Sequence, residues 1–105
     1  MSLTINRSAT AGPSGFTNIE AADLVAWGDL CGLEVVIKSA GADFGGAIAV
    51  VGCGEGIPSW AVYRVAGQMW IDFIPDPSRQ GFESYTVEVA SIEDAMAQII
   101  ADTEA

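Results

Sequence analysis

The side chains best suited to covalent chemistry are the thiols of Cys31 and Cys53, but the sequence supplies nothing to activate them. Cys53 has glycines around it, yet the chain contains no histidine that could act as a general base toward its thiol. A zinc site would have to be completed by carboxylates beside two distant cysteines. We therefore expect no catalytic residue, no metal and no cofactor, and we expect both cysteines to be buried free thiols.

Residues 52–56, Gly-Cys-Gly-Glu-Gly, have the composition of a phosphate-binding loop after a strand. Such a loop needs a helix N-terminus directly behind it, whereas here Ile-Pro-Ser leads into another strand. The lysine of a P-loop is also missing. The segment is therefore predicted to be a connection between two strands.

Charge is the most unusual property of the chain, because 14 acidic residues face 4 basic ones and give a formal net charge of -10. Direct nucleic-acid binding is disfavoured, since lysine and arginine make most phosphate contacts. The charge serves either solubility alone or recognition of a protein partner with a basic surface. The acids expected on helix exteriors, and hence at such an interface, are Glu20, Asp23 and Asp29 on a first helix and Glu93, Asp94, Asp102 and Glu104 on a second.

Two helices are predicted from capping signals. Thr17 and Glu20 have the spacing of a capping box, and Gly32 provides a stop. The apolar stripe of this helix is expected at Ile19, Ala22, Ala26 and Leu30, and its solvent side at Glu20, Asp23 and Asp29. Ser91 begins the second helix, whose stripe is Ile92, Ala95, Met96, Ile99 and Ile100. Asp102 and Glu104 lie at its carbonyl end, where an acid is unfavourable by roughly 0.3 to 1 kcal/mol.

Between the helices the apolar period changes to two, which predicts strands. They are expected at residues 33–38, 47–51, 60–65, 68–73 and 82–89. An arm or edge strand within residues 1–16 precedes a single domain over residues 17–105. Short connections favour an α+β fold, in which a four- to five-stranded antiparallel meander carries both helices on one face.

The hairpin of residues 60–73 is the stretch with two open registers. A three-residue turn puts Arg64 opposite Gln68 and assigns Ala61, Tyr63, Met69, Ile71 and Phe73 to the core face. A two-residue turn instead moves Trp60, Val62 and Arg64 onto the face that carries Met69, Ile71 and Phe73. Both registers keep Trp70 with Gln68 and Asp72, away from the core. We take the three-residue turn, which places Trp60, Trp70 and Asp72 on an open sheet face as partner-binding residues.

These features favour a non-enzymatic binding protein, most simply an inhibitor that docks on a basic, nucleic-acid-binding surface of a protein partner. In size and charge the chain resembles small acidic inhibitors of phages and mobile elements, including anti-CRISPR and anti-restriction proteins. That resemblance carries over no functional residue. The alternatives are a self-associating structural domain, such as a homodimer, and a toxin-neutralising immunity protein. No apolar run approaches roughly 20 residues, so we expect a cytoplasmic protein with no membrane partner.

Overall fold

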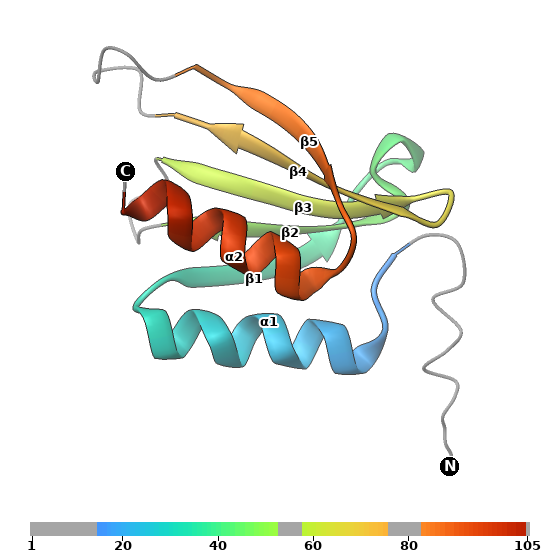
Figure 1. Ribbon diagram of the computed structural model, residues 1–105. Coiled ribbons are helices and arrows are strands. Elements are labelled where there is room, and N and C mark those ends of the chain that lie inside the picture. The colour runs from blue at the N-terminus through green and yellow to red at the C-terminus, as the bar shows by residue number, and fades with distance from the viewer. Residues whose placement is uncertain (1–14, 53–57, 76–82, 105) are drawn as a thin grey trace.

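The computed structural model describes residues 15–52, 58–75 and 83–104, which form an antiparallel sheet with two helices on one face (Figure 1). The strand order β1-β2-β3-β4-β5 follows the chain, so the sheet is a meander. In chain order the elements are α1 (Asn18–Cys31), β1 (Glu34–Ser39), the 3-10 helix η2 (Ala42–Phe44), β2 (Ala47–Gly52), β3 (Ser59–Val65), β4 (Gln68–Ile74), β5 (Tyr85–Val89) and α2 (Ile92–Thr103). The predicted α+β class and meander are confirmed. The expected strand within residues 1–16 and most of the glycine-rich segment lie outside the described residues.

Helix α1 begins and ends at the residues that the capping signals indicated. The Thr17 hydroxyl accepts a hydrogen bond from the Glu20 amide at 3.0 Å, and the Glu20 carboxylate accepts one from the Thr17 amide at 2.9 Å. Gly32 caps the other end with a left-handed φ of 73°. The local signal therefore fixes the position of the helix along the chain.

The predicted core face of α1 is wrong. Leu24 and Gly28 are buried, whereas Ile19 and Leu30 of the expected stripe are 66% and 87% exposed. Gly28 faces the sheet and lies so close to it that a Cβ at this position would be 2.5 Å from the Val35 side chain of β1. Helix α1 carries apolar residues around its whole circumference, so hydrophobic periodicity could not indicate which face packs against the sheet.

The register of the β3–β4 hairpin also differs from the one we expected. Val65 pairs with Gln68, which leaves a two-residue turn at Ala66 and Gly67. Both residues have positive φ, 54° and 83°, as the twist of a two-residue hairpin turn requires. As a result Trp60, which pairs with Phe73, belongs to the core face and is only 1% exposed.

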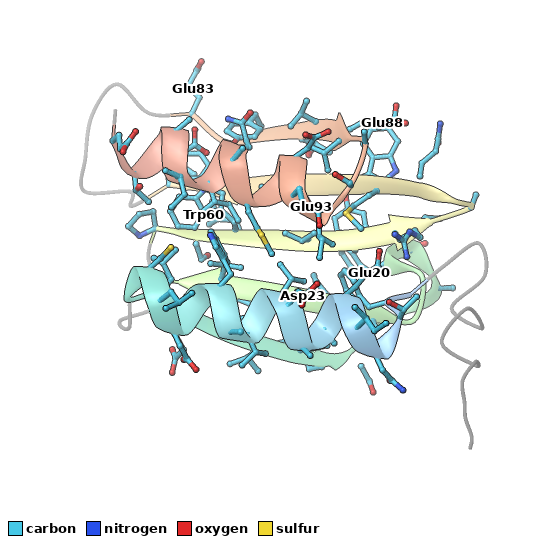
Figure 2. The ribbon with its side chains drawn as sticks, turned by 60° about the horizontal axis from the view of Figure 1, so that its bottom comes forward. Glu20, Asp23, Trp60, Glu83, Glu88 and Glu93 are labelled. Carbon is cyan, nitrogen blue, oxygen red and sulfur yellow. The ribbon has the colours of Figure 1, made fainter. Side chains whose placement is uncertain are left out.

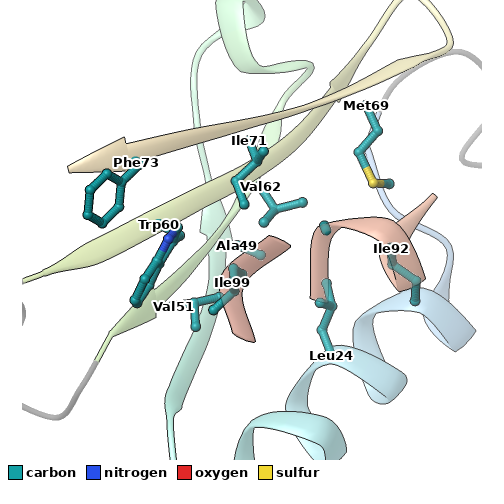
Figure 3. Packing of buried hydrophobic residues seen from close by; sticks show 11 residues of the cluster. Leu24, Ala49, Val51, Trp60, Val62, Met69, Ile71, Phe73, Ile92 and Ile99 are labelled. Atoms are coloured by element: carbon teal, nitrogen blue, oxygen red, sulfur yellow. The ribbon is translucent and has the colours of Figure 1, made fainter. Parts of the chain in front are cut away.

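The core lies between the sheet and the helices (Figure 3). Leu24 of α1 and Ile92, Ala95 and Ile99 of α2 pack onto the sheet. This confirms the stripe predicted for α2 at those three positions, whereas its other members, Met96 and Ile100, are half-buried. The remaining members of the buried cluster are Ala49, Val51, Trp60, Val62, Met69, Ile71 and Phe73. On the opposite face η2 covers part of β3, where Phe44 meets Tyr63 edge to face at 5.0 Å.

Candidate functional site

The two helices lie side by side on the sheet and run in the same direction (Figure 1). Between them is a shallow groove with a volume of about 520 Å³, which we call the helix groove. Its lining residues are Trp27 of α1 and Glu93, Met96, Ala97, Ile100, Ala101 and Glu104 on α2 and its C-cap. The groove thus combines an apolar floor with a glutamate toward each end.

The periodicity of α2 explains this lining. Ile92, Ala95 and Ile99 point into the core, and the neighbouring helical face carries Met96 and Ile100, which are half-buried. Ala97 and Ala101 continue that face outward and are exposed. Apolar surface therefore extends continuously from the core to the outside along the side of α2 that faces α1.

Acidic side chains flank the helix groove. Asp23 is one turn before Trp27 on the same side of α1, and Glu93 is in the first turn of α2 (Figure 2). Asp23, Glu93 and Glu104 are exposed, and neither helix contains a lysine or an arginine. These three carboxylates are the members of the predicted acidic set that the fold gathers around one apolar surface.

Glu20 has a different role from the exposed interface position that we predicted. Both of its oxygens accept hydrogen bonds from Arg64 of β3, at 2.8 and 2.6 Å, and Arg64 also donates to the Gly15 carbonyl at 3.1 Å. The hydrogen bonds from Arg64 are the main reason that the pKa of Glu20 lies below its ordinary value. This ion pair ties the first turn of α1 to the sheet.

Asp102 likewise points toward the sheet. Its carboxylate accepts hydrogen bonds from the Trp60 indole at 2.8 Å, from Gln98 at 3.2 Å and from the Tyr85 hydroxyl. Burial, followed by the contact with Asp102, raises the pKa of Tyr85. The position of Asp102 at the carbonyl end of α2 is thus explained by its contacts with β3 and β5.

The remaining predicted interface residues are dispersed. Asp29 and Asp94 are exposed on α1 and α2, away from the lining of the groove. Trp70 and Asp72 lie half-buried on the sheet face opposite the helices. Asp72 accepts a hydrogen bond from Tyr63 at 3.0 Å, and burial together with this contact raises the pKa of Tyr63 to about 12. The expectation that Trp60 belongs to an open face is wrong, because its side chain is in the core.

The expectation for the cysteines is also corrected at one position. Cys31, the last residue of α1, is a free and exposed thiol. Cys31 follows Leu24 and Gly28 at helical spacing, but it is exposed because it lies at the C-terminal end of the helix. Cys53 lies outside the described residues. Within the described ranges no three acidic or cysteine side chains gather as ligands for a metal ion.

Charge in the described ranges is strongly one-sided. Glu55 and Asp76 are the acids outside these ranges, which leaves 12 of the 14 inside them. The basic residues in the same ranges are Lys38 on β1 and Arg64 on β3, and Arg64 forms an ion pair with Glu20. Among the described residues, the exposed acids of α1 and α2 therefore have no lysine or arginine on either helix to offset their charge.

Sequence reasoning missed Trp27 as a surface residue and assigned Met96 and Ile100 to the core alone. A signal was present, since Trp27 follows Asp23 by four residues and shares its side of the helix. No protein family model matches the chain, and comparisons with curated proteins and with solved structures found no significant match. Among the described residues, the structure has no helix of the length and apolarity needed to cross a membrane.

Proposed function

We propose that this protein is a non-enzymatic binding domain that uses its helix layer to dock on a basic surface of a protein partner. The observation that carries this proposal is the arrangement of Asp23, Glu93 and Glu104, which are exposed around an apolar groove on helices without a basic residue. The acids provide long-range attraction, and the groove provides apolar area to bury.

A surface that otherwise holds nucleic acid is the kind of partner surface that suits this charge best. Such surfaces concentrate lysine and arginine to contact phosphates, and carboxylates on a helix exterior can occupy the same positions. Occupation of that surface would inhibit the partner without any chemistry. The protein therefore acts as a competitor whose strength depends on ionic strength.

The charge dependence is tested with two triple variants that change the net charge equally. The helix variant is Asp23→Asn, Glu93→Gln and Glu104→Gln. The control is Glu34→Gln, Asp43→Asn and Glu88→Gln, whose positions are exposed on β1, η2 and β5. Partners captured from a lysate of the native host are identified by mass spectrometry, purified and titrated against wild type and both variants at low and high salt.

We expect the helix variant to associate about tenfold more slowly than wild type at low salt, and the control variant to stay within about twofold. The difference should shrink as salt rises, because the Debye length falls to about 8 Å at physiological ionic strength. Equal association of both variants, or binding unaffected by salt, would show that the helix layer does not recognise the partner by charge.

The second candidate is self-association through the outer sheet face. It is favoured by Val36 and Ile74, which are 48% and 49% exposed on the same sheet face as the half-buried Trp70. Association through this apolar face should persist at high salt and weaken in a Trp70→Ala variant. Sedimentation of wild type and this variant distinguishes the two functions, because docking by the helix layer does not involve Trp70.

A further inference from the structure

We propose that the helix groove is the binding site for a basic amphipathic helix of the partner. The apolar face of that helix would pack against Trp27, Met96 and Ile100, and its lysines or arginines would reach Glu93 and Glu104. This inference rests on the proposed function and names the partner element that the helix layer binds.

The length and spacing of the groove suit a helix. Glu93 and Glu104 both line the groove and are separated by three turns of α2, or about 16 Å at ~1.5 Å per residue. Between them Met96, Ala97 and Ile100 recur at the three- and four-residue spacings by which helices pack side by side. Ala97 and Ala101 are small, so the backbone of an added helix can approach α2 closely.

The backbone chemistry of the groove also favours a helix over an extended segment. An extended peptide gains affinity by pairing its amides with a free sheet edge, but both walls here are helices, whose backbone groups bond within the helix. An extended chain in the groove would bury unpaired amides and carbonyls. A helix satisfies its own backbone and needs only an apolar face, which the groove complements.

Charge complementarity decides against a second copy of this chain as the occupant. Two copies would each bring a net charge of -10, and α1 and α2 could offer no basic residue to Glu93 or Glu104. Like charges brought together at an interface cost free energy, whereas lysines flanking an apolar stripe would pair with the glutamates. The occupant is therefore a segment with leucine-like residues on one side and lysine or arginine beside them.

The test uses a synthetic peptide probe of about 14 residues, roughly four helical turns, built from leucine, alanine and lysine with the leucines on one face. A scrambled peptide of equal composition, with leucines on all faces, is the control probe. Binding to the full chain is measured by fluorescence anisotropy of a label on each peptide. We expect the amphipathic peptide to bind at least about tenfold more tightly than the scrambled one, since only it presents a continuous apolar face.

Two alanine-to-arginine variants test the location. Ala101→Arg introduces a long charged side chain into the groove, and Ala22→Arg makes the same change on the exposed side of α1. We expect Ala101→Arg to weaken binding of the amphipathic peptide about tenfold or more and Ala22→Arg to weaken it less than about threefold. Ala97→Arg serves as a second groove variant if the first does not fold. In NMR spectra the indole signal of Trp27 should shift on binding, while that of Trp60, held by Asp102, should not.

Several results would overturn the inference. They are equal binding of the two peptides, no binding of either, an equal effect of the two arginine variants, or a homodimer that Ala101→Arg dissociates. An equal effect of the arginine variants would leave the proposed function intact, because attraction by charge alone does not need the groove. The proposed function instead fails if the helix variant of Asp23, Glu93 and Glu104 associates with its partner like wild type.

Discussion

Asparagine at position 102 would test whether the contacts of Asp102 with the sheet outweigh its unfavourable position at the carbonyl end of α2. The carboxylate accepts hydrogen bonds from Trp60 and Tyr85 on one oxygen and from Gln98 on the other. Hydrogen bonds to a charged group contribute about 1.5 to 3 kcal/mol each, roughly twice the value for neutral pairs. The Trp60 indole is buried, so water cannot replace a lost acceptor.

An asparagine oxygen can keep the contacts with Trp60 and Tyr85 but removes the charge. Halving two charged hydrogen bonds costs about 2 kcal/mol. Removal of the charge from the end of the helix returns about 0.3 to 1 kcal/mol. The net prediction for Asp102→Asn is a loss of about 1 to 2 kcal/mol. Asp102→Ala should lose about 3 kcal/mol, because it also leaves the buried indole without an acceptor.

Glu104→Gln is the matched control, because Glu104 is exposed and has the same charge at the same end of α2. It should leave stability unchanged or raise it by up to about 1 kcal/mol. Urea unfolding at constant pH and salt measures all three variants. Since 1 kcal/mol shifts the melting temperature of a domain of this size by about 4 to 8 °C, Asp102→Asn should melt about 4 to 16 °C lower. If Asp102→Asn is as stable as Glu104→Gln, the contacts with Trp60 and Tyr85 do not contribute as argued.

Three further substitutions and one titration probe the packing and the titrating groups. Gly28→Ala should destabilise the fold by about 1 to 3 kcal/mol in urea unfolding, because the added methyl group would lie 2.5 Å from a valine side chain of β1. Ala66→Asn should stabilise it by about 1 kcal/mol, since asparagine tolerates the left-handed φ of 54° better than alanine. Glu20→Gln should flatten the acid limb of stability against pH. Because the folded pKa of Glu20 is below 4.5, its contribution is complete above about pH 5 and is lost as pH falls through the folded value. In a spectrophotometric titration of the folded chain, Tyr63 should ionise at about pH 12 and Tyr85 also above its ordinary pKa of 10, so stability declines as pH rises beyond 10.

Each of these predictions can fail on its own. Wild-type stability of Gly28→Ala would mean that α1 can shift away from β1 without cost. No gain from Ala66→Asn would mean that the turn is not strained by alanine. Superimposable acid limbs for wild type and Glu20→Gln would remove the ion pair with Arg64 as a source of stability. Tyrosinate absorbance near pH 10 in the folded protein would show that the tyrosines are not held as the structure has them.

The sequence by itself determined the order of α1, α2 and the five strands and the residues at which the two helices begin, but not the 3-10 helix η2 or the start of β5. The capping residues Thr17, Gly32 and Ser91, and the alternation of apolar residues between the helices, all act within one to four residues. Interactions between residues so close in the chain can be recognised from the sequence without knowing the fold. They were enough to predict the order of helices and strands, and the short connections between strands were enough to predict the meander.

Tertiary contacts decided which face of β3 and which face of α1 pack into the core, whereas the buried positions of α2 followed from its periodicity. Both faces of the β3–β4 hairpin carry aromatic residues, so periodicity left two registers open. The observed register puts Arg64 against Glu20, and Trp60 against Asp102, which is 42 residues away in the chain. The face of α1 was decided in the same way, because only the glycine at position 28 allows the helix to approach β1 so closely.

The candidate site depended most on these long-range contacts. Trp27 and Met96 line one groove although they are far apart in the sequence, and no local pattern relates them. The charge of the chain was evident from composition, but composition could not separate Asp23, Glu93 and Glu104 at the groove from Glu20 and Asp102, which bind the sheet. Whether a carboxylate faces solvent or an internal donor depends on what the fold brings opposite it, and that is a property of the packed structure.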